Sequence, residues 1–201
     1  KGNWFLSAIF VLLISIGFYW TINSKLQTAY TQSIINLTAE QEVELSKNTD
    51  TFEGKRKREA IFAEYGKRLA ERQMIPVVGD KLFYFFSFEP SGFFRPLISL
   101  VCFYIPLTIL FATLFGHLGN FSVVFGKDYA ALSVCSFMAW SAAHLPFTIS
   151  GILLYSQEIN PQIYLTFWAM SGLIFGFLMV FALRVVLGVN YGVAILTIAI
   201  S

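Results

Sequence analysis

The stretch WFLSAIFVLLISIGFYWTI, residues 4–22, decides the fold class of this chain because it carries no charge. A helix rises about 1.5 Å per residue, so a stretch of this length crosses the hydrocarbon core of a bilayer. Trp4, Tyr19 and Trp20 lie near its ends, where aromatic rings favour the membrane interface. A cleaved signal peptide would have a shorter core and a small-residue cleavage site, whereas residues 23–26 are Asn-Ser-Lys-Leu. We therefore expect a retained transmembrane helix.

The composition of the whole chain agrees with a membrane protein. Of the 201 residues, 56% are hydrophobic and 13% are charged, whereas soluble domains carry about 25% charge. A soluble fold of this size could not bury so much apolar surface. The net charge of +2 argues against a nucleic-acid partner. Because the chain starts at Lys1 and stops at Ser201 inside an apolar run, we expect it to be a piece of a longer protein.

Three further stretches are long and apolar enough to span a bilayer: 96–116, 129–155 and 161–183. Asp128 is placed to cap the helix over 129–155, and Asn160 followed by proline is placed to begin the helix over 161–183. The sequence therefore predicts at least four transmembrane helices.

Several local features refine these spans. Pro106 is expected to kink the span over 96–116, and residues 121–125 are expected to form a brief amphipathic turn at the surface. A fifth apolar stretch, 185–201, is interrupted near Gly188. It either continues beyond Ser201 or forms a turn with the fourth span near this glycine.

Residues 24–91 form a charged segment that contains ten of the fourteen basic and ten of the twelve acidic residues. Thr38 and Gln41 fit a capping box at the start of a first helix. A second helix is predicted over 55–74, supported by the spacing of Glu64 and Arg68. The aromatic residues of 82–94 predict an interfacial helix followed by a turn.

We therefore predict an all-α fold, a polytopic transmembrane bundle of four to five spans with a helical extramembrane loop after the first span. Its predicted parts are a first transmembrane helix over 1–23, the charged loop over 24–91 and a bundle of three to four helices over 92–201. Lys1, Lys127 and Arg184 lie on the side opposite the long loop, and long loops translocate largely regardless of charge. This favours a cytoplasmic N-terminus and an external loop.

One basic cluster in the loop has two interpretations. Lys55, Arg56, Lys57 and Arg58 could bind anionic lipid headgroups. They could equally be the solvated start of a helix whose charge is balanced by nearby acids.

His144 is the main candidate for a functional residue within the membrane, where ionisable side chains are costly and usually functional. A polar site for transport is one interpretation. The other is a neutral imidazole that bonds a neighbouring helix or the backbone carbonyl freed by Pro146. The four spans contain no acidic partner for a proton relay.

Catalytic and metal-binding patterns are absent from the sequence. Ser150 lies six residues after His144, on a different helical face, and no nucleophile elbow surrounds it. Cys102 and Cys135 are expected to be small apolar residues of the spans. We therefore expect no enzyme, no metal and no cofactor, although a histidine among many aromatic rings would also suit a lipid or pigment held by a larger assembly.

Gly172 and Gly176 form a Gly-x-x-x-Gly pair in the fourth span. Such pairs let helix backbones approach closely. This pair fits packing within the bundle and contact with a partner equally well.

The layout and two short segments resemble a known family. The layout is one span, a charged helical loop and a C-terminal cluster of spans joined by short turns. The segments are residues 116–146, with Gly119-Asn120-Phe121 and His144-Leu145-Pro146, and residues 182–194, with Arg184, Gly188 and Gly192 near the last turn. In these features the chain resembles the Yip family of Rab-interacting-protein-like membrane proteins, in its bacterial branch.

This resemblance implies a binding or scaffolding role without catalytic residues, in a bacterial inner membrane. We therefore expect a non-catalytic accessory or scaffolding subunit of a larger membrane complex, with membrane lipid and other membrane-protein subunits as partners. The alternative is a small transporter or channel component that uses a polar path around His144.

Overall fold

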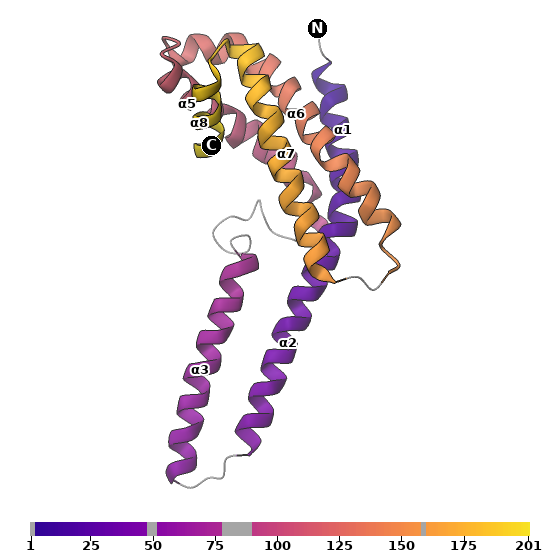
Figure 1. Ribbon diagram of the computed structural model, residues 1–201, viewed down its shortest axis with the longest axis vertical. Coiled ribbons are helices and arrows are strands. Elements are labelled where there is room, and N and C mark those ends of the chain that lie inside the picture. Colours follow the sequence, from indigo (N-terminus) through magenta and orange to yellow (C-terminus); the bar gives the residue numbers. More distant parts are fainter. Residues whose placement is uncertain (1–2, 48–51, 78–89, 158–159) are drawn as a thin grey trace. The chain divides into compact units, whose positions relative to one another are not determined.

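The computed structural model describes residues 3–47, 52–77, 90–157 and 160–201 (Figure 1). Every secondary-structure element in these residues is a helix, which confirms the predicted all-α class. The chain divides into two compact units. One comprises Lys1–Asn23 and Pro90–Ser201, and the other comprises Ser24–Glu89.

The first unit contains most of the helices, in chain order α1 (Trp4–Phe18), the π-helix η1 (Tyr19–Asn23), the 3₁₀-helix η3 (Pro90–Phe94), α4 (Arg95–Ser99), the π-helix η4 (Leu100–Tyr104), α5 (Ile105–Gly116), α6 (Phe121–Leu153), α7 (Pro161–Leu187) and α8 (Tyr191–Ile200). The second unit contains α2 (Ser24–Ser46) and α3 (Phe52–Val77).

Four helical stretches of the described residues are long and apolar enough to cross a membrane: Trp4–Ser46, Gly92–Gly116, Phe121–Leu153 and Gln162–Leu187. This is the arrangement of an integral membrane protein. The helix α8 has 10 residues, which at about 1.5 Å per residue covers about half of a bilayer.

Asparagine side chains begin four of these helices. The Oδ1 atoms of Asn3, Asn120, Asn160 and Asn190 accept hydrogen bonds from backbone N–H groups in the first turns of α1, α6, α7 and α8. The predicted cap at Asn160 is therefore confirmed. The predicted cap at Asp128 is wrong, because Asn120 starts the helix two turns earlier and Asp128 lies inside α6. For the same reason Phe121–Phe125 is helical and not a separate surface turn.

The region around Pro106 differs from a simple kink. A π-helical turn, η4, directly precedes the proline. Proline has no N–H to donate and its ring crowds the carbonyl four residues earlier, so a widened turn accommodates it.

The core of the first unit is centred on α6. This helix packs against α1, α5 and α7, and the short α8 packs between α5 and α7. Fully buried side chains line these contacts: Val11, Ile109, Leu132, Phe137, Met179 and Leu183. Burial is uneven among the spans. In the most apolar 18 residues of Phe121–Leu153, 50% are buried, whereas in the most apolar 18 residues of Gln162–Leu187 only 17% are buried.

The turn between α7 and α8 is held at two points. Gly188 ends α7 in the left-handed conformation, with φ of 70°, which favours glycine. Across the turn, the guanidinium carbon of Arg184 lies 3.8 Å from the centre of the Tyr191 ring. The turn predicted near Gly188 is therefore present.

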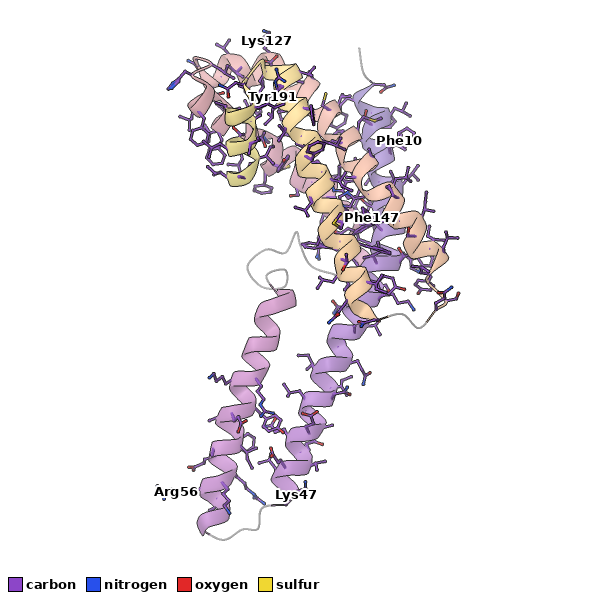
Figure 2. The ribbon with its side chains drawn as sticks, viewed as in Figure 1. Phe10, Lys47, Arg56, Lys127, Phe147 and Tyr191 are labelled. Carbon is purple, nitrogen blue, oxygen red and sulfur yellow. The ribbon has the colours of Figure 1, made fainter. Side chains whose placement is uncertain are left out.

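The second unit is a helical hairpin, in which Lys47 and Arg56 lie at the same end (Figure 2). The predicted capping box at Thr38 is wrong. The helical backbone runs without a break from Trp4 to Ser46, so no new helix begins there, and the Thr38 hydroxyl donates to the Ile34 carbonyl at 3.0 Å.

The second predicted helix is longer than expected. The helix α3 spans Phe52–Val77, so it passes Pro76 by one residue. The predicted pairing of Glu64 with Arg68 is present as an ion pair. Of the aromatic segment 82–94, residues 82–89 lie outside the described residues, and Pro90–Phe94 form η3.

Candidate functional site in the membrane bundle

His144 lies in α6 with 9% of its surface exposed. Its Nδ1 is 2.9 Å from the Trp140 carbonyl oxygen. A carbonyl can only accept, so Nδ1 carries the hydrogen and Nε2 of the neutral ring is an acceptor. The bond is thus to a carbonyl one turn back in its own helix, and not to a neighbouring helix or to the carbonyl that Pro146 frees.

Two aromatic rings enclose the imidazole. The Trp140 ring stacks on it with ring centres 3.9 Å apart, and Phe18 of α1 meets it edge to face at 4.9 Å. A charged imidazolium would lose its hydration in this position, so the surroundings suit the neutral ring.

The helices α1 and α6 run parallel, as two ring contacts establish. Trp4 meets Phe137 near the start of α1, and Phe18 meets His144 near its end. Both members of the second pair come later in the sequence than those of the first. We refer to this contact of α1 and η1 with α6 as the polar seam, because three polar side chains that lie in it are buried: Thr21, His144 and Thr148.

The polar seam depends on close approach at two glycines. A Cβ on Gly17 would lie 2.7 Å from Cγ2 of Thr148. A Cβ on Gly151 would lie 2.7 Å from Oγ1 of Thr21 and 3.0 Å from Cγ1 of Ile22. Each helix therefore contributes a glycine that receives a threonine of the other, as small residues do in membrane helix pairs.

Most buried hydroxyls of the bundle are satisfied within their own helices. Seven of them donate to the carbonyl four residues earlier: Ser7, Thr21, Thr108, Thr113, Ser133, Ser136 and Thr148. Ser15, Ser141 and Thr197 differ, since their hydroxyl oxygens are buried without a hydrogen-bond partner among the described residues. The Oδ1 atom of Asn23, in η1, is in the same state.

One buried cation was not predicted from the sequence. Arg95, the first residue of α4, is 8% exposed. A Cβ on Gly92 would lie 3.1 Å from its Cδ and Nε and 3.2 Å from Cε1 of Tyr19, so the arginine packs over the glycine and beside the end of α1. The signal in the sequence was a single arginine immediately before an apolar span.

The residues weighed for catalysis do not assemble. The Ser150 hydroxyl donates to the Pro146 carbonyl, while His144 bonds Trp140. Cys102 and Cys135 are both free thiols. Within the described parts of the chain, no group of three or more His, Cys, Asp or Glu side chains is placed to hold a metal ion.

The two glycines predicted to mediate packing lie in α7 but differ in their surroundings. A Cβ on Gly172 would meet no atom within 4 Å, and one on Gly176 would be at an ordinary contact distance of 3.6 Å from Ile198 of α8. Tight packing inside the chain therefore involves Gly17 and Gly151 rather than the Gly-x-x-x-Gly pair.

The basic cluster occupies the first turns of α3. Lys55, Arg56 and Lys57 are exposed and Arg58 is half-buried. A shallow groove beside it is lined by both signs of charge, from Glu44, Lys47, Lys57, Ala60, Ile61 and Glu64. The cluster is thus exposed but adjoins acidic side chains.

Comparison with protein-family models, with curated proteins and with solved structures found no match to this chain.

Proposed function

We propose that this chain is a non-catalytic integral membrane protein that acts as an accessory or scaffolding subunit of a larger membrane complex. The observation that carries the proposal is the uncovered face of α7. Leu173 is 69% exposed, and Gly172 faces open space. A glycine inside a helix costs about 0.5–1 kcal/mol relative to alanine. Packing of another helix against the open face at Gly172 would offset that cost.

The hairpin supplies a second surface for a partner. Its two helices, α2 and α3, carry most of the charge of the chain, and an extramembrane hairpin with both signs of charge suits protein contacts. Under this proposal residues 24–91 lie outside a bacterial inner membrane and the N-terminus is cytoplasmic. The resemblance to the Yip family supports the same binding role.

Site-specific photo-crosslinking in native membranes tests the proposal. A photoreactive residue at Leu173 should form a discrete adduct with another protein, whereas one at Met179, which is fully buried, should not. Gly172→Leu should abolish the adduct by filling the open space at this position, and Val185→Leu, at another exposed position of α7, is the control for added volume. Adducts at Leu173 with lipid alone would contradict the proposal.

Transport through the polar seam is a second candidate function. It is favoured by the buried hydroxyls of Ser15 and Ser141 close in sequence to His144 and Phe18. This function predicts a flux in proteoliposomes that is lost in His144→Ala and is sensitive to acidification through about pH 6–7. A flux unchanged by both would contradict it.

A further inference from the structure

One backbone carbonyl of the Gly92–Gly116 span has lost both of its possible helical donors. In the π-helical turn η4, the N–H of Ile105 donates to the carbonyl of Leu100, five residues earlier, and not to that of Val101. The next N–H along the chain would serve Val101 in the same pattern, but residue 106 is proline, which has none. The Val101 carbonyl therefore needs a donor from outside its own helix.

The hydroxyl of Tyr129 supplies that donor. It belongs to α6 and donates to the Val101 carbonyl oxygen at 2.9 Å. Most hydroxyls of the bundle bond carbonyls of their own helix, whereas this bond joins two spans at residues 28 apart in sequence. A carbonyl without a donor is costly inside a bilayer, so the bond stabilises the π-helical turn.

The Tyr129 ring is positioned by aromatic contacts along α6. Its centre lies 4.7 Å from that of Phe125, whose ring centre in turn lies 5.4 Å from that of Phe121. These residues are four apart, so their rings share one face of the helix. The position of the hydroxyl thus follows the first turns of α6.

We propose that Tyr129 is the latch of a proline hinge in the Gly92–Gly116 span. With its hydroxyl on the Val101 carbonyl, the residues before Pro106 are held at one angle to α5. When this bond is broken, neither helical pattern of the turn satisfies every carbonyl, and the part before the proline bends over a wider range of angles on the part after it. The bend of this span is thereby coupled to the position of α6. The latch is independent of any partner protein.

Distances between two spin labels in lipid bilayers measure the hinge directly. The labels are attached through Ile98→Cys in α4 and Leu114→Cys in α5, both at exposed positions, in a chain that also carries Cys102→Ala and Cys135→Ala. The distribution of distances should broaden when Tyr129→Phe is added, because the hydroxyl that holds the turn is removed. A distribution that Tyr129→Phe leaves unchanged would overturn the proposal.

A second pair of labels is the control for this measurement. Leu114 and Val185 are both exposed, and both lie after the hinge, in α5 and α7. The distance between labels at these positions should be the same with and without Tyr129→Phe. Broadening of both distributions would show general loosening of the bundle and would contradict a hinge at Pro106.

Pro106→Ala gives an independent test, because alanine supplies the N–H that this turn lacks. Tyr129→Phe should lower the ratio of folded to unfolded protein about fivefold in the chain with Pro106. In Pro106→Ala the same change should lower it by less than about twofold, and the distribution between residues 98 and 114 should narrow again. Equal losses in the two chains would contradict the latch.

Tyr191→Phe is the matched control for the loss of a tyrosine hydroxyl. Tyr191 is 49% exposed, and phenylalanine keeps the ring that Arg184 faces. This variant should be about as stable as the unmodified chain in both the Pro106 and the Pro106→Ala background. If Tyr129→Phe alone does not fold, the double variant with Pro106→Ala should still fold, and its failure to fold would contradict the proposal.

Discussion

Gly17 of α1 lies directly against the side chain of Thr148 of α6: a Cβ at residue 17 would lie 2.7 Å from the Thr148 Cγ2 atom. The threonine cannot easily move away. Its hydroxyl donates to the His144 carbonyl at 2.9 Å, which holds the rotamer of a side chain that is already stiff in a helix. The contact therefore couples the position of α1 to the turn of α6 that carries His144.

Gly17→Ala should destabilise the membrane bundle. The added methyl group forces the helices apart or distorts Thr148, which typically costs about 1–3 kcal/mol. Gly172→Ala is the control, because a Cβ there meets nothing within 4 Å and alanine favours the helix. Unfolding of both variants in mixed micelles measures the difference. Equal stability of the two variants would show that the α1–α6 approach is not as close as described.

Thr148→Ser should rescue Gly17→Ala. Serine removes the Cγ2 atom that the new methyl group meets and keeps the hydroxyl that bonds the His144 carbonyl. A double-mutant cycle should therefore give a favourable coupling of about 0.5–3 kcal/mol, as contacting residues do. Strict additivity of the two substitutions would contradict a direct contact.

The sequence predicted the membrane class and the spans because those depend on local composition. The absence of charge over residues 4–22 is sufficient for a spanning helix, and Asn160 before proline marks a helix start that needs no tertiary information. Helix starts that depend on context were missed. Asp128 has the residue type of a helix cap, but α6 already begins after Asn120. Thr38 also has that residue type, but the helix that precedes it continues through it.

The close contacts could not be read from the sequence. Gly172 and Gly176 have the spacing known for helix packing, whereas Gly17 and Gly151 are isolated in sequence and become a pair only through the register of α1 on α6. His144 was identified by its chemistry, but its bond to Trp140 depends on a rotamer, which the order of residues does not specify.

Asn190→Ala should destabilise the attachment of α8. The side chain accepts a hydrogen bond from the Val193 N–H at 2.9 Å, which satisfies one of the free donors at the helix start. Loss of an asparagine cap costs about 0.5–2 kcal/mol. Hydrogen exchange at the first residues of α8 should accelerate in this variant. Asn36→Ala, at an exposed position inside α2, should leave that exchange unchanged, and equal effects would contradict the capping role.

The hairpin should weaken at alkaline pH through Tyr65. Burial, followed by a hydrogen bond from its hydroxyl to Glu44, raises the pKa of Tyr65 above its usual value of 10.0. Because the folded state holds this proton more tightly than the unfolded state, the stabilisation is complete below pH 10 and is lost as the pH rises through the folded pKa.

Carbon-13 NMR of labelled tyrosines follows this titration, with Tyr65→Phe identifying the signal. The Tyr65 signal should titrate above pH 10, and the melting temperature of Tyr65→Phe should fall less steeply above pH 10 than that of the unmodified chain. A Tyr65 signal that titrates at pH 10 or below would contradict the hydrogen bond to Glu44.

The role as a subunit is tested most directly by the mass of the assembly that leaves the native membrane. The chain should be extracted with its surrounding lipid by a mild amphipathic polymer, purified by a tag, and weighed by native mass spectrometry. We expect a complex with at least one other protein at fixed stoichiometry, which Gly172→Leu dissociates without unfolding the chain. A monodisperse monomer carrying only lipid would contradict it.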